Sequence, residues 1–430
     1  MQRKVDNRGM REINRAIVLD IIRHSAQISR AELANRSALT KPTVSAIVDD
    51  LMRDGTVREV GFAETASNGG RPARLLEFNG QSAAYLGIHF SARGTAVAVA
   101  DARGVIRAIA EGPSIKGSPK KSMEALEPLL EEALISASVP RGRLQSVGVA
   151  VHGPVEQSTG VCVVSPNLGW HDVPLRSMVK DAFGLPVVVH NEAHAAAVAE
   201  GRVGAAVGVA SFVWLYSGTG IGSGVVIDGK LFFGFRGFGG EIGHCPVTDD
   251  AGRVCACGRR GCLETVASGM AIARAAKQAV AGSEPTVLRG SRRPLDAAAV
   301  TAAARDGDKV AKRILSEVGE HLGKGISYLL NILDPEMIVV AGDPASAGEA
   351  LFEPLRASVD RHALQPRGVR IVPSILGARA EIIGAVLLAM DHVRGGVRTV
   401  SFVSATQPTA EGPEGHPGRL DSRLAVISDR

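Results

Sequence analysis

Three cysteines and one histidine form the clearest candidate for a chemical site in this sequence of 430 residues. The four side chains, in the pattern H-x10-C-x-C-x4-C, are His244, Cys255, Cys257 and Cys262. Thiolates with one imidazole suit a tetrahedral Zn²⁺ ion and leave no position for an activated water. The pattern therefore predicts a structural zinc ion. The alternative, a set of free thiols, is less usual for three cysteines within eight positions beside Gly258 and Gly261.

A glycine-rich loop follows the apolar run 211–216 and precedes a second apolar run at 225–227. Its residues that could face a phosphate are Gly218, Thr219, Gly220 and Gly222. Glycines let backbone N–H groups crowd around a phosphate, and the threonine adds a hydroxyl. The spacing does not match a dinucleotide-binding fingerprint, because a strand rather than a helix follows. We expect a hairpin that holds a phosphate, although an ordinary tight turn would give the same pattern.

Amide and carboxylate side chains elsewhere in the chain suit the hydroxyl groups of a sugar, because each polar atom donates or accepts in a fixed direction. The predicted ligand-binding residues are Asn167, Asn191, Glu192, Glu241, His244 and Glu264. Glu241 and Glu264 bracket the cysteine cluster. Asn191 and Glu192 end the apolar run 187–190, which is a suitable place for a general base at the end of a strand. Surface ion pairing is the alternative for any one of these carboxylates taken alone.

The first 80 residues have helical periodicity and carry 13 Lys and Arg against 10 Asp and Glu, more than half of the net charge of +5. Ser29 and Glu32 form a capping box at the start of one short helix. Thr40 can cap a further helix, with Pro42 in its first turn. The apolar face of an earlier helix, over 11–23, is predicted to consist of Ile13, Ala16, Ile17 and Ile21.

This succession of helices is typical of a helix-turn-helix, in which the start of the third helix enters the major groove of DNA. The predicted DNA-binding residues are Lys41, Thr43 and Ser45 on that helix, and Arg71 and Arg74 on the tip of a wing. Short polar side chains can reach base edges, and Lys41 can meet a phosphate. Strands at 57–61 and 74–78 would form the wing, whose arginines suit the narrow minor groove. The alternative is a three-helix interaction domain with a solvated face.

From about residue 85, short apolar runs alternate with alanine-rich helical stretches, which predicts an α/β fold. The stretches 86–101 and 213–228 share one pattern of strand, small turn, strand and Asp, which indicates two related lobes. A tail at 394–430, polar and rich in Gly and Pro, is predicted to be disordered. We see no apolar signal segment and no run of ~18 apolar residues, so we expect a cytoplasmic protein without a membrane partner.

Together these motifs resemble the ROK family of repressors and sugar kinases, over about residues 81 to 393. The stretches that carry the resemblance are Glu241–His244 and Cys255–Glu264, with weaker similarity at His152–Val155, Pro166–Asn167, Gly218–Gly222 and Asp334–Val339. The resemblance implies a two-lobed, actin-like ATPase (sugar-kinase-like) fold, with a structural zinc ion on His244 and the three cysteines. It also implies sugar contacts at Asn167, Glu241, His244 and Glu264. An N-terminal winged helix-turn-helix belongs to the repressor branch, as in the xylose-operon repressors.

The expected division of the chain follows from this resemblance. It consists of a winged helix-turn-helix domain at 1–80, a first lobe at 81–192 completed by about 379–393, a second lobe with the zinc site at 193–378, and the tail at 394–430.

The nucleotide side departs from the kinases of the family. Where those kinases have Asp-x-Gly-Gly-Thr, this chain has His89–Arg93, which lacks the acid, both glycines and the threonine. Glu192 stands in place of their catalytic Asp and is one methylene longer, and a misplacement of ~1 Å can cost ~10²-fold in rate. The usual Gly-Gly of their adenosine loop reads Gly342-Asp343. We therefore expect no kinase activity, with Glu192 at a vestigial base position.

The sequence thus predicts a DNA-binding transcriptional regulator of carbohydrate-related genes, a repressor by family precedent. A sugar or sugar phosphate in the cleft would control it, and a homodimer or higher homo-oligomer would read two operator half-sites. One alternative is an active ATP-dependent sugar kinase with a DNA-binding head. Another is a regulator controlled by a protein partner without a small ligand.

Overall fold

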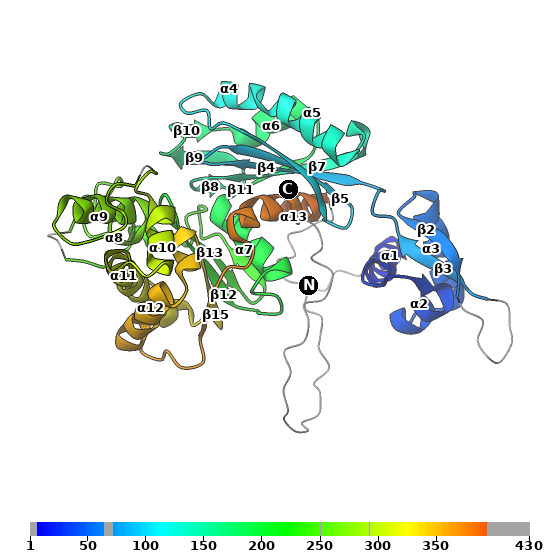
Figure 1. Ribbon diagram of the computed structural model, residues 1–430. Helices are drawn as coiled ribbons and strands as arrows, with labels where there is room; N and C mark the ends of the chain where they lie inside the picture. The colour runs from blue at the N-terminus through cyan, green and yellow to red at the C-terminus, as the bar shows by residue number, and fades with distance from the viewer. Residues whose placement is uncertain (1–6, 64–71, 250–251, 292, 394–430) are drawn as a thin grey trace.

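The computed structural model describes residues 7–63, 72–249, 252–291 and 293–393. Figure 1 shows a small N-terminal head beside a larger body, and the body is divided into two lobes. Among the helices of these ranges, none is long and apolar enough to cross a membrane. The tail predicted at 394–430 lies outside the described residues.

Three helices form most of the head: α1 (Asn7–Arg23), α2 (Arg30–Ser37) and α3 (Lys41–Arg53). The predicted caps are present. Glu32 N donates to the Ser29 hydroxyl at 3.2 Å, and Thr43 N donates to the Thr40 hydroxyl at 3.4 Å. The chain turns between α2 and α3 at Ala38, which has a φ of 55°. The buried face of α3 consists of the predicted residues Val44, Ile47, Val48 and Leu51.

The face that α1 buries differs from the prediction. Val18 and Ile22 are fully buried, whereas Ile13 and Ile17 keep 46% and 40% of their surface exposed. Ala16 is exposed as well. Because apolar residues lie on more than one side of α1, only its packing against α2 and the wing decides which stripe turns inward. A stripe made of Met10, Ile13 and Ile17 is left on the surface of the head.

The head also holds a three-stranded sheet of order β1-β3-β2, made of β1 (Ile28–Ser29), β2 (Val57–Phe62) and β3 (Arg74–Phe78). It is tied to the body by Arg103, whose Nη2 donates to Glu77 Oε1 at 2.7 Å and to the Phe78 carbonyl at 2.8 Å. Ala102 belongs to the hydrophobic core of the head. The turn that carries these two residues is therefore a direct link between the wing strand and the first lobe.

Each lobe contains a five-stranded sheet with the same topology. The first has the order β11-β7-β4-β5-β6, and its strands are β4 (Ala84–Phe90), β5 (Thr95–Asp101), β6 (Ile106–Gly112), β7 (Leu144–Val151) and β11 (Val187–Asn191). The second has the order β14-β13-β12-β15-β16, and its strands are β12 (Phe212–Ser217), β13 (Ile221–Ile227), β14 (Lys230–Phe232), β15 (Met337–Ala341) and β16 (Arg370–Pro373). In both, an antiparallel meander opens the lobe and two later strands join in parallel. The internal repeat seen in the sequence is this shared opening.

Helices cover the outer faces of the two sheets (Figure 1). The first lobe carries α4 (Pro119–Glu124), α5 (Leu126–Ala137) and α6 (Leu175–Phe183), with a small sheet of β8 (Val155–Glu156), β9 (Val161–Ser165) and β10 (Trp170–Val173). The second lobe carries α8 (Glu264–Ala267), α9 (Gly269–Ala281), α10 (Ala297–Arg305), α11 (Lys309–Leu333) and α12 (Glu349–His362).

Two helices, α7 (Glu192–Val203) and α13 (Ala380–Val393), pack on each other between the sheets. α13 lies against β4 and β7, and α7 lies against β12 and β13. Their approach is close, because a Cβ added to Gly384 would lie 1.8 Å from the Ala195 carbonyl oxygen. Since α7 begins directly after β11, its first residue, Glu192, stands where the lobes meet. The domain boundaries given above stay predictions.

Candidate functional site

The predicted zinc ligands come together in space. One ligand atom from each of His244, Cys255, Cys257 and Cys262 lies within 4.8 Å of all the others. Cys257 Sγ is 3.7 Å from Cys262 Sγ, and Cys255 Sγ is 3.6 Å from His244 Nδ1. Around a tetrahedral ion with Zn–S bonds of ~2.3 Å, ligand atoms are about 3.7 Å apart. A disulfide would need about 2.05 Å. The cluster therefore fits a tetrahedral metal ion.

The segment between the ligands is short enough to hold this geometry by itself. His244 closes a 3-10 turn, and isolated bridges join Pro246 to Cys262 and Val254 to Arg260. Gly258 and Gly261 have φ values of 84° and 75°, which side-chain-bearing residues rarely adopt.

The other two cysteines lie outside this cluster. Cys162 is buried in the core of the first lobe, where burial raises its pKa to about 12. Cys245 is half-buried, and its carbonyl accepts a hydrogen bond from Leu263 N. Neither was predicted to be a ligand.

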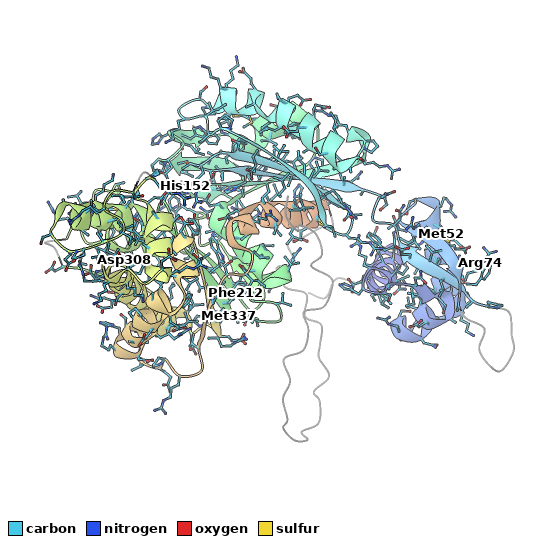
Figure 2. The ribbon with its side chains drawn as sticks, viewed as in Figure 1. Met52, Arg74, His152, Phe212, Asp308 and Met337 are labelled. Atoms are coloured by element: carbon cyan, nitrogen blue, oxygen red, sulfur yellow. The ribbon has the colours of Figure 1, made fainter. Side chains whose placement is uncertain are left out.

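Glu192 joins two histidines at the junction of the lobes. Its Oε2 is 3.0 Å from His89 Nε2, and its Oε1 is 2.7 Å from His152 Nδ1. The other ring nitrogen of His152 is 2.8 Å from Asn167 Nδ2. Figure 2 shows His152 where the two lobes face each other. A continuous polar chain thus runs from Asn167, a predicted sugar contact, to His89 on strand β4.

This chain carries charge. Burial raises the pKa of Glu192, but the charges and hydrogen bonds of His152 and His89 outweigh burial and hold that pKa far below its usual range. Burial lowers the pKa of both histidines, yet the hydrogen bond and charge of Glu192 raise each above 6.5. The charges of Glu264 and Glu241 add to the rise at His152. Glu192 is therefore ionised, and its charge is balanced by imidazoles.

Glu241 and Glu264 belong to the same group of side chains. Burial raises the pKa of Glu241, the charges of His244 and His152 lower it, and the charge of Glu264 raises it. Glu264 Oε2 accepts a hydrogen bond from Ile221 N at 3.0 Å. The site thus presents two carboxylates and two imidazoles to one region, a donor and acceptor set suited to sugar hydroxyls.

Asn191 has a different environment from the other predicted ligand residues. Its Nδ2 donates to the Gly153 carbonyl at 2.9 Å, and its Oδ1 accepts from Ala193 N at 2.8 Å. Both ends of the amide are engaged, so Asn191 caps α7 and thereby orients Glu192, the first residue of that helix.

The glycine loop is a hairpin turn between β12 and β13, where Ser217 pairs with Ile221. Gly218 N donates to the Gly220 carbonyl at 3.0 Å, and the Gly218 carbonyl accepts from Gly269 N at 2.5 Å. A Cβ on Gly220 would lie 2.5 Å from Glu264 Oε2. A side chain at this position would therefore require the Glu264 carboxylate to move. The predicted phosphate contacts of this loop and of Thr219 and Gly222 stay predictions.

The loop that replaces the kinase phosphate loop makes its own contacts. Arg93 Nη2 donates to Tyr216 Oη at 2.5 Å, across from the first lobe to the second. The pKa of Arg93 is raised by Tyr216 first and also by Asp343 and Glu381, while burial lowers it. Burial raises the pKa of Glu381, whose Oε2 has no hydrogen-bond partner among the described residues. The charges of Asp343 and Glu381 thus act on Arg93 beside its hydrogen bond to Tyr216.

The start of α3 presents the three residues predicted to read DNA. Lys41 is exposed, and Thr43 and Ser45 are half-buried. The Thr43 hydroxyl is 2.8 Å from the Thr40 hydroxyl, and the Ser45 carbonyl accepts from Arg30 Nη1 at 3.3 Å. Lys41 makes no ion pair within the part of the chain that the structure describes. Of these three residues, Lys41 is therefore the one that can contact a DNA phosphate without first breaking an ion pair.

The structure describes only one of the two predicted wing arginines, Arg74. Arg71 lies outside the described residues. Arg74 Nη1 donates to Glu59 Oε2 at 2.5 Å, and its guanidinium lies 6.0 Å from the Phe62 ring (Figure 2). A contact between Arg74 and DNA would compete with this cross-strand ion pair.

Sequence reasoning missed the roles of His89, His152, Arg93 and Tyr216. The stretch His152–Val155 contributed to the family resemblance, but His152 was not predicted to touch the site. Its partner Glu192 is 40 residues away, and Arg93 is 123 residues from Tyr216. The sequence did show that His89–Arg93 lacks the residues of the kinase phosphate loop. This difference indicated that the side chains of this stretch make other contacts.

Comparisons with known proteins agree with this arrangement. Residues 85–392 match the model of the ROK family, and residues 10–58 match a winged helix-turn-helix DNA-binding model. A putative xylose repressor from Caldicellulosiruptor sp. is 34% identical over 89% of this chain and 97% of its own length.

Two solved structures are similar over most of the chain. A ROK family transcriptional regulator, described as a homologue of the E. coli MLC protein, has a TM-score of 0.75 and 27% identity, covering 88% of this chain and 95% of that one. A ROK family glucokinase from Streptomyces griseus, in complex with glucose and AMPPNP, has a TM-score of 0.64 and 31% identity, covering 71% and 99%. The predicted fold, a winged helix-turn-helix followed by a two-lobed sugar-kinase-like body, is confirmed.

Proposed function

Because the chain belongs to the ROK family and carries an N-terminal winged helix-turn-helix, we propose that it is a transcriptional regulator that represses carbohydrate-related genes. It binds operator DNA through the head and a sugar or sugar phosphate between the lobes. The observation that carries this proposal is the coexistence of a winged helix-turn-helix head with a lobe junction where the predicted sugar contacts keep their polar groups and Arg93 bonds to Tyr216. The similar regulator and the similar xylose repressor support it.

On the DNA side, the exposed Lys41 at the start of α3 meets a phosphate, while Thr43 and Ser45 approach base edges. Arg71 and Arg74 act at the wing, in the minor groove. For Arg74 this means exchanging the Glu59 carboxylate for DNA.

On the effector side, the sugar hydroxyls bind to Asn167, Glu241, His244 and Glu264. Glu192 contributes indirectly, because it bonds to His152, which contacts Asn167. The glycine-rich turn retains the position of a phosphate loop, and its residues are Gly218, Thr219, Gly220 and Gly222. The effector can shift the equilibrium between DNA-bound and DNA-free arrangements only by its difference in affinity for the two.

The chain has no kinase activity in this proposal. Two histidines occupy both carboxylate oxygens of Glu192 and lower its pKa, which makes it a weak base toward a sugar hydroxyl. Arg93 bonds to Tyr216 where the family's kinases have a threonine of their phosphate loop. A sugar can be bound and positioned without proton transfer to Glu192 or Arg93.

The metal in this proposal is a structural Zn²⁺ ion on His244, Cys255, Cys257 and Cys262. Such an ion stabilises the loop that carries Glu264, and it brings the imidazole of His244 next to the sugar group.

The proposed assembly is a homodimer or higher homo-oligomer in the cytoplasm, where two heads meet two half-sites of an operator. The exposed apolar stripe of Met10, Ile13 and Ile17 supports self-association, because a helix stripe of this kind is stabilised by burial against a second copy. Arg103 supports communication, because it bonds the wing strand to the first lobe.

The test is selection of genomic fragments by the full-length protein, followed by release with a panel of monosaccharides, their phosphates and ATP. We expect specific fragments and release by one sugar or sugar phosphate. The substitution Lys41→Ala should weaken binding to all selected fragments and reduce the slope of log affinity against log salt by about one. Lys312→Ala, which changes an exposed lysine of the body, is the matched control.

The outcomes separate the alternatives. Failure to select any fragment would contradict the regulator. Sugar phosphorylation with ATP would favour the kinase with a DNA-binding head. Specific DNA binding that no compound of the panel releases would favour control by a protein partner.

A further inference from the structure

A cavity of about 530 Å³ opens in the second lobe between the cysteine loop and the start of α9. Its polar and charged lining comprises Arg253, Arg260, Glu264, Thr265, Ser268 and Arg274. This volume is in the range of small-ligand sites, about 300–1,000 Å³. None of the three arginines was among the predicted ligand residues. The cavity therefore adjoins the cysteine cluster through Cys255 and the sugar group through Glu264.

Three guanidiniums line the cavity, and the hydrogen bonds that two of them make within the described residues go to backbone carbonyls. Arg260 Nη1 donates to the Gly252 carbonyl at 3.1 Å, and Arg274 Nη2 donates to the Thr265 carbonyl at 2.5 Å. Arg253 is exposed. Within the described ranges, no carboxylate forms an ion pair with any of these three guanidiniums. Glu264, the only acid in the lining, is already an acceptor for Ile221 N.

The arginines also act on one another. Both Arg253 and Arg274 line this cavity, and the pKa of Arg274 is lowered first by burial and then by the charge of Arg253. An anion between them would offset this effect. Guanidinium groups bind the oxygens of a phosphate through paired N–H donors, which makes a phosphate the anion that this lining suits.

The position of Glu264 limits the identity of the ligand further. A carboxylate at the wall of the cavity repels a simple anion but accepts hydrogen bonds from hydroxyl groups. A ligand that carries both hydroxyls and a phosphate satisfies both parts of the wall. The same carboxylate belongs to the sugar group of Glu241, His244 and His152.

We propose that this cavity binds the phosphate of a phosphorylated sugar, with Arg253, Arg260 and Arg274 around the phosphate and Glu264 on a hydroxyl. The inference rests on the proposed sugar-binding role of the cleft, and it selects a sugar phosphate over a free sugar as the tighter effector. Arg253 is the best position for a test, because its exposed side chain makes no hydrogen bond with any described residue.

The experiment is calorimetric titration of the full-length protein, in phosphate-free buffer at constant ionic strength. The probes are glucose and glucose 6-phosphate, xylose and xylose 5-phosphate, and inorganic phosphate. We expect one phosphorylated sugar to bind at least about tenfold more tightly than its free form, because charge-assisted bonds to phosphate are strong. Arg253→Glu should abolish this advantage. Arg253→Gln should reduce it less.

Lys277→Ala is the control, because Lys277 is exposed on α9 and does not line the cavity. The metal content and melting temperature of each variant show whether the cysteine loop is intact. The inference is overturned if phosphorylated and free sugars bind equally, or if the advantage survives in Arg253→Glu.

Operator release separates this inference from the proposed function. Release by a free sugar alone would leave the regulator intact and overturn the phosphate cavity. Loss of inorganic phosphate binding in Arg253→Glu, in a protein that selects no DNA, would support the cavity and contradict the regulator.

Discussion

The polar side chains in the two halves of the cleft have different kinds of partner. In the half proposed to bind the sugar, Glu241 and Glu264 act electrostatically on His152, and His244 also belongs to the cluster with the three cysteines. In the nucleotide half, Arg93 crosses from the first lobe to bond with Tyr216. The first half keeps polar groups that can still accept or donate to a ligand, whereas the second half uses its charges on itself.

Glu192 lies between the halves and contacts a residue on each side. It faces His152, on the sugar side, with one oxygen and His89, on the former phosphate loop, with the other. This carboxylate thus links the two sides. A cleft can lose a reaction while retaining recognition, because recognition needs fixed donors and acceptors, and the reaction also needs a free base and room for a phosphate.

The largest effect should come from breaking the support of the sugar half. Cys257→Ser removes one of four metal ligands, and we expect loss of bound zinc and a melting temperature lower by about 5–10 °C, since metal binding is linked to folding. Sugar binding should be lost with the metal. Cys245→Ala, at a cysteine outside the cluster, should keep zinc. Unchanged metal content in Cys257→Ser would contradict the ligand assignment.

A smaller effect is expected from breaking the link between the halves. Glu192→Gln leaves two half-buried histidines without their anion, which should cost about 3 kcal/mol of stability at pH 6. Glu192 raises the pKa of His89 and His152 above 6.5, so its contribution is fully present below pH 6.5 and is lost as the pH rises through the raised values. The difference between wild type and variant, from denaturant unfolding, should therefore shrink from pH 6 to pH 8.5.

The stability of the wild type must be compared with that of the variant at each pH, because His190 and His194 change stability with pH in the opposite direction to the Glu192 contacts. Burial lowers the pKa of His190 to about 3 and that of His194 to about 4. Both therefore destabilise the fold as the pH falls below 6.5, in wild type and variant alike. Glu132→Gln, on the exposed side of α5, is the control. A difference that grows with pH would contradict the ionised Glu192 pair.

The smallest effect should come from opening the nucleotide half. Arg93→Ala removes one interlobe hydrogen bond at a partly exposed position, so we expect a stability loss of about 1 kcal/mol or less. ATP should stabilise neither wild type nor variant in a thermal-shift assay, because Asp343 and the bulky loop at His89 remain. Stabilisation of the variant by ATP would show instead that Arg93 alone excludes the nucleotide.

Local patterns in the sequence predicted the elements whose geometry is local. The spacing of His244 and the cysteines predicted a metal cluster, because a few residues and two glycines suffice to bring the thiols together. The caps at Ser29 and Thr40 were predicted for the same reason, since a cap bonds to an amide three residues away. The two-lobed body was predicted from a family resemblance spread over more than 300 residues.

The contacts that give each half of the cleft its character were decided only by the tertiary structure. The partners of Glu192 and of Arg93 lie 40 to 123 residues away, and no spacing rule connects residues at such distances. The same holds for α1, where periodicity found apolar residues but the packing of the head chose Val18 and Ile22 over Ile13 and Ile17. The sequence by itself determined which chemical groups are available, and the packing of α7 and α13 between two sheets determined which of them meet. The physical reason is that a helix or strand presents several faces, and only its neighbours select one.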